Sequence, residues 1–357
     1  MRQNIYIFSN TILRKKNDTL LVETDTLSKP AHEADIDSEE YETLITPAGE
    51  TKGFSKKYIP AQNVESVFAF GSVRMNTQFL GMAAKYSIPV HVFGYYGNYI
   101  GSFLPSKEIN SGSILLDQTK HYLDDSKRLA IAKKFIEGAS GNANANLKYY
   151  KFRNCPLDYE TERISTLIEL IREAKSIGEL MALEGNVKSV YYRSWEKFLK
   201  QDMEFEKRVK RPPDSAINSL MSYGNVIMYS ICLNEIYRTG LNPAIGFLHS
   251  TGDNRLPLSF DVAEIFKPVI IDKSIFRVIN LEMITEADFK NRNGMCLIGE
   301  KAKRAFVEEI EKKLKTTFYS KEMKRSITYR TLIRLECHKL IKHLNGTEEY
   351  RAYVQEA

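Results

Sequence analysis

The sequence predicts an α+β protein, with a small N-terminal β-rich domain at residues 1–105 and a larger all-α domain at residues 106–357. In the first hundred residues, short runs of β-branched and aromatic residues alternate with turn signals, which is the pattern of strands. Beyond Pro105 the apolar residues recur at the 3.6-residue period of amphipathic helices. A chain of 357 residues is also long enough to form two hydrophobic cores.

The β-rich domain is predicted to contain one helix, residues 76–86. Asn76 opens it with a capping residue type, and apolar residues follow at helical spacing. The predicted strands are 5–8, 11–13, 19–22, 41–45, 64–70, 90–93 and 99–104.

The all-α domain is predicted to consist of long amphipathic helices separated by proline and glycine. Breaks are expected at Pro156, at residues 211–213 and 240–243, and in the loop 249–257. The predicted helices are 112–153, 158–175, 176–201, 213–238, 257–267, 299–315 and 326–345.

The composition is that of an ordinary globular protein, with 43% hydrophobic and 27% charged residues. The sequence lacks both an apolar run of ~18 residues and the apolar stretch of a signal peptide, so a cytoplasmic protein without membrane contact is expected. The cysteines lie far apart without a paired motif, which argues against a zinc ribbon or a disulfide framework. We expect four buried, reduced thiols: Cys155, Cys232, Cys296 and Cys337.

The formal net charge of +6 is concentrated in one region. Residues 301–330 hold ten Lys or Arg against four Asp or Glu. A basic region of this kind suits a polyanion such as nucleic acid, although solvated helix faces would give the same count. The acidic run at residues 32–42 is typical of a solvated loop.

Glu184 is the first candidate for chemistry. On a helix it shares a face with Met181, Val187 and Tyr191, which predicts that it packs against the protein interior. A carboxylate there costs several kcal/mol unless it is paired, protonated or bound to a metal. On spacing alone, an ion pair with Arg or Lys is the more common arrangement.

His249, Asp261 and Glu264 are the other candidates. His249 ends an apolar run and enters a polar loop, where catalytic groups concentrate, although a lone histidine is more often structural. Asp261 and Glu264 stand three residues apart on a predicted helix, so their charges repel unless a cation lies near them. The alternative for this pair is a solvated acidic edge.

Together, one imidazole and two or three carboxylates predict a site for Mn²⁺ or Mg²⁺. Oxygen donors favour both ions, and the histidine shifts the preference toward Mn²⁺. A zinc site would more usually show cysteines, several histidines or a His-Glu-x-x-His motif, which the sequence lacks.

Four motifs follow one another along the chain: LEG (183–185), RPPDSAINSL (211–220), GFLH (246–249) and DVAEIFKP (261–268). The N-terminal part adds FGSV (70–73), IPVHVFG (88–94) and GNYIG (97–101). In this order, these segments resemble the CRISPR-associated integrase family, the catalytic subunit of the spacer-acquisition complex.

The resemblance implies that Glu184, His249 and Glu264 are catalytic metal ligands and that Asp261 has an auxiliary role. It implies a metal-dependent DNA endonuclease and integrase that inserts captured DNA fragments as new spacers into a CRISPR array by transesterification from a 3′-hydroxyl. Asp214 is expected to cap the helix that follows the proline pair.

The resemblance also implies several binding partners. They are DNA (a double-stranded fragment and the CRISPR repeat), a second copy of the chain bound through the β-rich domain, and a small ferredoxin-like CRISPR-associated protein. Two other functions remain open from the residues themselves. One is a non-catalytic nucleic-acid-binding subunit, and the other is a metal hydrolase of small phosphoesters, for which no Walker or Rossmann glycine pattern is present.

Overall fold

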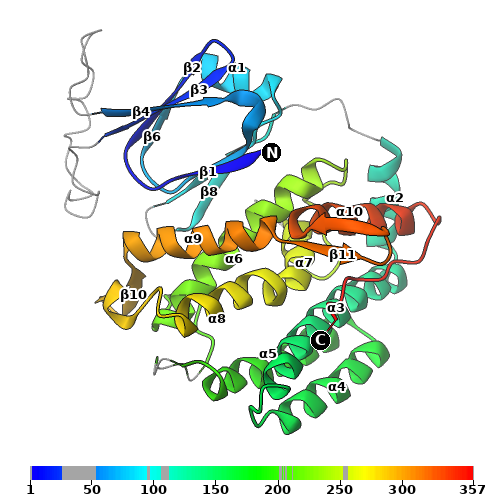
Figure 1. Ribbon diagram of the computed structural model, residues 1–357. Coiled ribbons are helices and arrows are strands. Elements are labelled where there is room, and N and C mark those ends of the chain that lie inside the picture. Colours follow the sequence, from blue (N-terminus) through cyan, green and yellow to red (C-terminus); the bar gives the residue numbers. More distant parts are fainter. Residues whose placement is uncertain are drawn as a thin grey trace. The chain divides into compact units, whose positions relative to one another are not determined.

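The computed structural model describes residues 2–25, 54–94, 97–105, 112–200, 203, 205, 207–210, 212–251 and 256–356. The chain divides into two compact units, Met1–Glu108 and Ile109–Ala357 (Figure 1). The first unit is rich in strands and the second is mostly helical. The predicted α+β fold class is therefore confirmed.

The N-terminal unit contains two four-stranded sheets and one helix. In one sheet β1, β5 and β7 are parallel and β8 pairs antiparallel to β7. In the other, β2, β3 and β4 are antiparallel and β6 is parallel to β2. The bounds are β1 (Gln3–Ile7), β2 (Thr11–Lys16), β3 (Thr19–Asp25), β4 (Phe54–Pro60), β5 (Val64–Ala69), β6 (Val73–Met75), β7 (Val90–Phe93) and β8 (Tyr99–Phe103).

The helix α1 (Thr77–Lys85) begins as predicted, because the Asn76 side chain accepts a hydrogen bond from the Phe79 backbone N–H at 3.0 Å. Its buried face, with Phe79 and Met82, joins the apolar core that the strands build around Leu13 and Val67. The predicted strand at 41–45 lies outside the described residues. Strands β4 and β6 were not predicted, since β4 carries two lysines and β6 has three residues.

The second unit is built around α3, which packs against α4, α5 and α7 (Figure 1). The π-helical turn η4 follows α7 directly. The helices are α2 (Gly112–Leu123), α3 (Asp125–Lys151), α4 (Asp158–Glu173), α5 (Ile177–Arg193), α6 (Ala216–Tyr237), α7 (Pro257–Phe266), η4 (Lys267–Asp272), α8 (Lys273–Asn280), α9 (Glu300–Lys315) and α10 (Tyr329–Leu344).

Two helix predictions are corrected by side chains that cap helices. The segment 112–153 is two helices, because the Asp124 carboxylate accepts from the backbone N–H groups of Ser126 (3.0 Å) and Lys127 (3.1 Å) and starts α3. The cap of α6 is Ser215, so the prediction that Asp214 caps this helix is wrong. Asp214 instead accepts a hydrogen bond from the Asn218 side chain at 2.8 Å.

The prediction that the second unit is all-helical is also corrected, because it contains two short hairpins. They pair β9 (Phe289–Arg292) with β10 (Met295–Ile298), and β11 (Thr317–Ser320) with β12 (Arg325–Thr328). The first hairpin turns at Asn293-Gly294, where both residues have positive φ, as a tight hairpin turn requires.

Trp195, the only tryptophan of the chain, is fully buried in the second unit. It lies in a short 3₁₀ turn (Ser194–Lys197) that follows α5 and contacts Tyr191 edge to face, with the ring centroids 5.6 Å apart. The four cysteines are free thiols, and three of them are buried. Within the described ranges, no helix has the length and apolar character needed to cross a membrane.

Candidate functional site

The loop between α6 and α7, which carries His249, is held by side chains of neighbouring helices. On α2, Gln118 Nε2 donates to the backbone carbonyls of Asn242 (2.9 Å) and Ile245 (2.8 Å). On α3, Arg128 Nε donates to the carbonyl of Phe247 at 2.9 Å. His249 therefore lies on a loop whose backbone is fixed by the helical scaffold.

Asp261 on α7 is the centre of this loop's hydrogen bonding. Its fully buried carboxylate accepts from the backbone N–H groups of Phe247 (2.6 Å), Leu248 (3.1 Å) and His249 (3.0 Å). Its Oδ1 also lies 2.7 Å from Nδ1 of the His249 ring. Because a carboxylate accepts, Nδ1 carries the proton of that bond, and Nε2 is the ring nitrogen left for other partners.

Gly246 allows this arrangement because there is no room for a side chain. A Cβ at this position would lie 2.9 Å from Asp261 Oδ2 and 2.7 Å from Pro257 Cβ. The glycine of the GFLH motif thus permits the loop backbone to approach the carboxylate. The alternative of a solvated acidic edge is wrong, since both Asp261 and Glu264 are buried.

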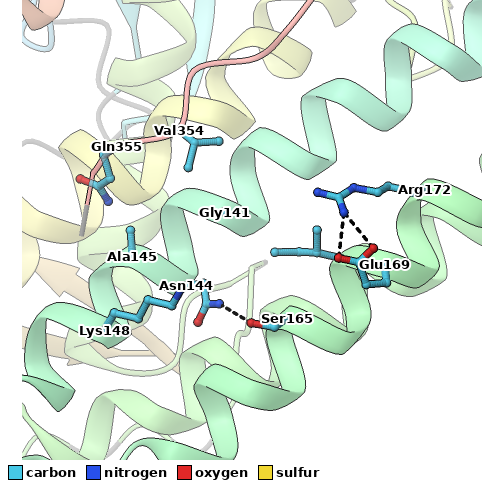
Figure 2. Close-up of a pocket in the computed structure, with 10 residues that line it drawn as sticks. Gly141, Asn144, Ala145, Lys148, Ser165, Glu169, Arg172, Val354 and Gln355 are labelled. Carbon is cyan, nitrogen blue, oxygen red and sulfur yellow. Dashed lines mark hydrogen bonds and ion pairs between the residues drawn. The ribbon is translucent and has the colours of Figure 1, made fainter. Parts of the chain in front are cut away.

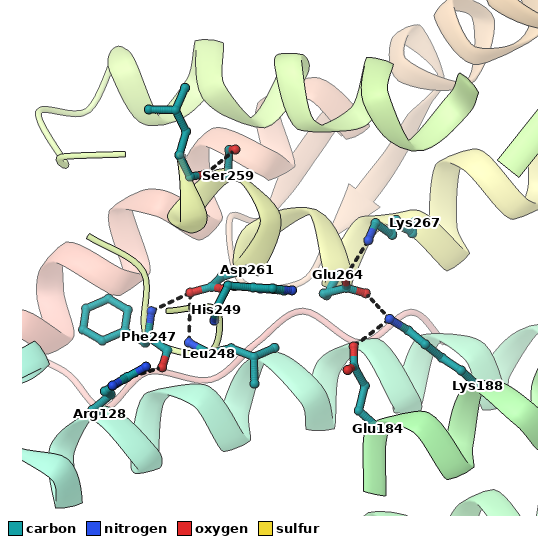
Figure 3. A network of polar contacts seen from close by, with 11 residues as sticks. Arg128, Glu184, Lys188, Phe247, Leu248, His249, Ser259, Asp261, Glu264 and Lys267 are labelled. Carbon is teal, nitrogen blue, oxygen red and sulfur yellow. Dashed lines mark hydrogen bonds and ion pairs between the residues drawn. The ribbon is translucent and has the colours of Figure 1, made fainter. Parts of the chain in front are cut away.

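Glu184 on α5 and Glu264 on α7 meet at one ammonium group. Lys188 Nζ lies 2.6 Å from Glu184 Oε1 and 3.0 Å from Glu264 Oε2 (Figure 3). The second oxygen of Glu264 lies 2.5 Å from Lys267 Nζ. The ion pair that was the alternative for Glu184 is therefore present, and it joins two of the predicted site residues.

The charges of this group stabilise one another. Burial alone would raise the pKa of the Glu264 carboxyl, but Lys188 and Lys267 outweigh burial and hold that pKa well below its usual range. Burial likewise disfavours the charged form of Lys188, yet Glu264 and Glu184 raise its pKa well above the usual value. At neutral pH the Glu264 carboxyl is therefore ionised.

The His249 ring extends from Asp261 toward Glu264 (Figure 3), and His249 is among the groups that act electrostatically on the Glu264 carboxyl. In the part of the chain that the structure describes, no three His, Cys, Asp or Glu side chains are arranged around a common metal position. The chemistry of the donors nonetheless fits Mn²⁺ or Mg²⁺. Two carboxylates already share one cation, and an imidazole with its Nδ1 held by a carboxylate lies beside them.

Sequence reasoning missed three charged groups near this site. Lys188 and Lys267 lie within one turn of the glutamates they bind, but spacing alone does not tell toward which neighbour a lysine turns. Asp272 is buried next to Tyr191, and burial raises the pKa of its carboxyl to about 7. The prediction that Met181 lies on the packed face of the helix with Val187 and Tyr191 is wrong, because Met181 is 46% exposed.

The basic region at 301–330 comprises α9, the β11–β12 hairpin and the start of α10. Lys312, Lys315 and Lys324 are exposed. Lys313 lies with its Nζ 4.3 Å from the centroid of the Tyr329 ring, and burial lowers its pKa. The exposed lysines are therefore the ones that are open to a polyanion.

Comparison with known proteins places this chain in a family. The sequence model of the family "CRISPR associated protein Cas1" matches residues 5–312. The chain belongs to the Cas1 family. Among its Cas1 relatives, a CRISPR-associated endonuclease Cas1 from Thermodesulfovibrio yellowstonii is 38% identical over 355 residues, covering 99% of each protein. Another, from Fusobacterium nucleatum, is 36% identical over 99% of this chain and 96% of that protein.

Solved structures show the same Cas1 fold. A CAS1 protein from Thermotoga maritima matches with a TM-score of 0.81 and 31% identity, covering 98% of this chain and 99% of that one. A casposase bound to an integration product matches with a TM-score of 0.83 over 99% of this chain and 94% of that one. At 18% identity, the casposase shows likeness of fold alone.

Proposed function

We propose that this chain is a divalent-metal-dependent DNA endonuclease and integrase that inserts captured DNA fragments into a CRISPR array by transesterification from a 3′-hydroxyl. Membership of the Cas1 family supports the coarse function, because its relatives are named CRISPR-associated endonucleases. The observation that carries the proposal is the convergence of the Glu184 and Glu264 carboxylates on one cation beside His249.

Glu184, Glu264 and Nε2 of His249 are the groups that would hold Mn²⁺ or Mg²⁺. When bound, the ion would supply Lewis-acid stabilisation of the charge that develops on the phosphodiester. Asp261 fixes the ring orientation of His249 through Nδ1 and thereby presents Nε2. Its oxygens are already used by three backbone N–H groups and the ring, which assigns it an orienting role.

Lys188 and Lys267 add positive charge beside the carboxylates, which favours the approach of a phosphodiester to an otherwise acidic site. Lys267 also lies with its Nζ 4.7 Å from the centroid of the Tyr229 ring, a contact that limits its movement. The exposed lysines at 301–330 are proposed to hold DNA through its phosphates, without reading bases.

The proposed partners are DNA, a second copy of this chain and a small ferredoxin-like CRISPR-associated protein. Two strand-transfer events in fixed relation need two active sites, which one chain with one site does not provide. One structural neighbour of the same fold is a Cas6-RT-Cas1–Cas2 complex, and the casposase neighbour is bound to an integration product. These are properties of the neighbours, and they motivate the same classes of partner here.

The experiment compares Glu184→Gln and His249→Ala with wild type in cleavage and strand-transfer assays with and without Mn²⁺. Both variants should lose metal-dependent cleavage and joining and keep their DNA affinity, because they remove metal donors and no basic side chain. Glu169→Gln is the matched control, since Glu169 also forms an ion pair, with Arg172 on α4, and lies outside the site.

Full Mn²⁺-dependent strand transfer by Glu184→Gln would refute the proposed site. In that case the carboxylates serve as ion pairs only, and the non-catalytic DNA-binding function becomes the better one. Cleavage of small phosphoesters with no activity on DNA would favour the third function, a metal hydrolase.

A further inference from the structure

The backbone leaves α-helical geometry two residues after Glu264. The helix α7 ends at Phe266, and Lys267–Asp272 form the π-helical turn η4. Pro268 lacks the backbone N–H that would bond to the Glu264 carbonyl in an α-helix. Single π turns within helices are frequent at functional sites. The directions of the Glu264 and Lys267 side chains therefore depend on what holds this turn.

Two buried asparagines on α3 bind the carbonyls at this turn. Asn142 Nδ2 donates to the Ile265 carbonyl at 2.9 Å, and Asn146 Nδ2 donates to the Pro268 carbonyl at 2.8 Å. The two asparagines are four residues apart and so lie on one face of α3. Asn146 Nδ2 also donates to the Tyr191 hydroxyl at 2.8 Å. Because Tyr191 is on α5 with Glu184, Asn146 bonds both to the helix that carries Glu184 and to the turn that follows the helix of Glu264.

Gln355 orients both asparagines. Its backbone N–H donates to Asn142 Oδ1 at 2.7 Å, and its Nε2 donates to Asn146 Oδ1 at 2.9 Å and to the Asn142 carbonyl at 2.9 Å. Since each Oδ1 accepts from Gln355, each Nδ2 is turned toward the π turn. Gln355 Oε1 in turn lies 2.5 Å from Lys273 Nζ, at the start of α8.

The approach of residues 350–355 to α3 depends on two glycines. A Cβ on Gly138 would lie 2.6 Å from Ala352 Cβ, and one on Gly141 would lie 3.0 Å from Val354 Cγ1. Figure 2 shows Val354 and Gln355 of this segment beside Gly141 and Ala145 of α3. The contact is therefore built into α3 at four positions: two glycines that make room and two asparagines that bind.

We propose that Asn142, Asn146 and Gln355 are positioning residues for the site carboxylates, and that Gln355 is the residue of segment 350–355 that fixes the direction of the Glu264 side chain. The inference rests on the proposed function, because carboxylates that bind a metal ion must point toward one position. Segment 350–355 lies beyond residues 5–312, which the family's sequence model matches. In each of the two buried asparagines, both the amide nitrogen and the amide oxygen have hydrogen-bond partners. A fully hydrogen-bonded buried network of this kind favours one backbone geometry.

The first arm of the test needs no metal. Hydrogen–deuterium exchange is measured on peptides covering residues 264–272 in wild type, Gln355→Ala and Tyr350→Phe. Tyr350→Phe is the matched control: it removes a buried hydrogen bond of the same segment, from the Tyr350 hydroxyl to Glu336 Oε1 (2.8 Å), and leaves the asparagines untouched. Gln355→Ala should speed exchange in 264–272 about tenfold, as expected for the loss of one or two hydrogen bonds. Tyr350→Phe should leave this exchange within about twofold of wild type.

The second arm measures Mn²⁺ affinity by calorimetry on the same full-length proteins. Gln355→Ala should raise the dissociation constant about tenfold, as expected when a hydrogen bond that positions a ligand is lost, whereas Tyr350→Phe should not change it. Melting temperatures are recorded for all variants. Equal effects of the two substitutions at equal loss of melting temperature would overturn the proposal, because general stability would then explain them.

Wild-type exchange in 264–272 and wild-type Mn²⁺ affinity in Gln355→Ala would also overturn the positioning role. Absence of Mn²⁺ binding by the wild-type chain would instead refute the proposed function. In that case the exchange arm still decides whether Gln355 controls the π turn, so the two failures are distinguishable.

Discussion

Lys188 holds the position between Glu184 and Glu264 that a divalent ion would need. Its ammonium group contacts both carboxylates, and its side chain is 33% exposed. A lysine with a path to solvent can leave when a more highly charged cation arrives. In the proposed site, Lys188 therefore competes with the metal ion for the two carboxylates. When no metal ion is bound, the Lys188 ammonium group neutralises their charge.

Replacing Lys188 with methionine should tighten Mn²⁺ binding by about tenfold, because a competing charge is removed from both ligands. The metal-free variant should melt at a lower temperature than wild type, since two carboxylates lose a partner, and Mn²⁺ should restore the loss. Calorimetry and thermal denaturation measure both effects. Lys197→Met is the control, because Lys197 pairs with Glu160 away from the site. Unchanged or weaker Mn²⁺ binding in Lys188→Met would contradict the competition.

Asp272 should make stability depend on pH. Burial raises its pKa to about 7 in the folded chain from an ordinary value of 3.8, so the folded state binds the proton more tightly. The stabilisation is complete below the ordinary pKa and is lost as pH rises through about 7. Asp272→Asn mimics the protonated form. The urea midpoint of Asp272→Asn minus that of wild type should increase between ~pH 4 and ~pH 7, and this difference should then level off.

The control for this pH dependence is Asp158, an exposed residue whose pKa is lowered by its hydrogen bond to Lys151. A lowered pKa gives the opposite sign, since stabilisation is lost as pH falls. The urea midpoint of Asp158→Asn minus that of wild type should therefore not increase as pH rises from ~4 to ~7. A flat difference between Asp272→Asn and wild type over this range would show that Asp272 is ionised throughout.

At the scale of elements, α9 and the β11–β12 hairpin are the expected DNA-binding surface. Combined Lys312→Ala, Lys315→Ala and Lys324→Ala should weaken binding to duplexes of any sequence. Each lost phosphate contact should reduce the slope of log affinity against log salt by about 0.9. Lys120, Lys127 and Lys151, on α2 and α3, provide a triple control of equal charge. Normal binding by the first variant would mean that another surface holds the DNA.

Elements that bury one face were predicted from the sequence, because burial imposes a period on the apolar residues. The helix α1 is an example, whereas β5 is buried along its whole length and was predicted from its β-branched and aromatic residues. Periodicity did not reveal β4, because its lysines interrupt the apolar pattern. It also did not reveal the break at Asp124, where one helix ends and the side chain of Asp124 caps the start of the next. The β9–β10 turn had a local signal in Asn293-Gly294, but its short strands fell between predicted helices.

The candidate site was predictable as a set of residue types but not as a network. Sequence placed Glu184, His249, Asp261 and Glu264 on a helix, a loop and a second helix. It did not show that Asp261 binds the loop backbone or that Lys188 bridges the glutamates, because both contacts join residues that tertiary packing brings together. Gln355 reaches α3 across more than two hundred residues of sequence, beyond any spacing rule.

At the scale of the whole molecule, the chain should form a homodimer through its N-terminal unit. The strand β8 is at the end of its sheet and carries Ile100, which is 64% exposed. Exposed apolar residues on an edge strand are typical of association surfaces. Sedimentation at micromolar concentration should show a dimer for wild type and a monomer for Ile100→Arg.

Leu123→Arg is the control for this experiment, because Leu123 is 73% exposed and belongs to the helical unit. This variant should remain dimeric. A monomeric wild-type chain would contradict the expected assembly. A monomeric Leu123→Arg variant would show that the dimer interface involves the helical unit.

The single tryptophan also gives the molecule an internal optical reporter. Trp195 is buried against Tyr191 in the helical unit, and the sheet unit contains no tryptophan. Selectively excited indole fluorescence therefore follows the melting of the helical unit alone, whereas circular dichroism sums over both units. Where the two signals separate during denaturation, the units unfold independently, and where they coincide, the chain unfolds as one cooperative block.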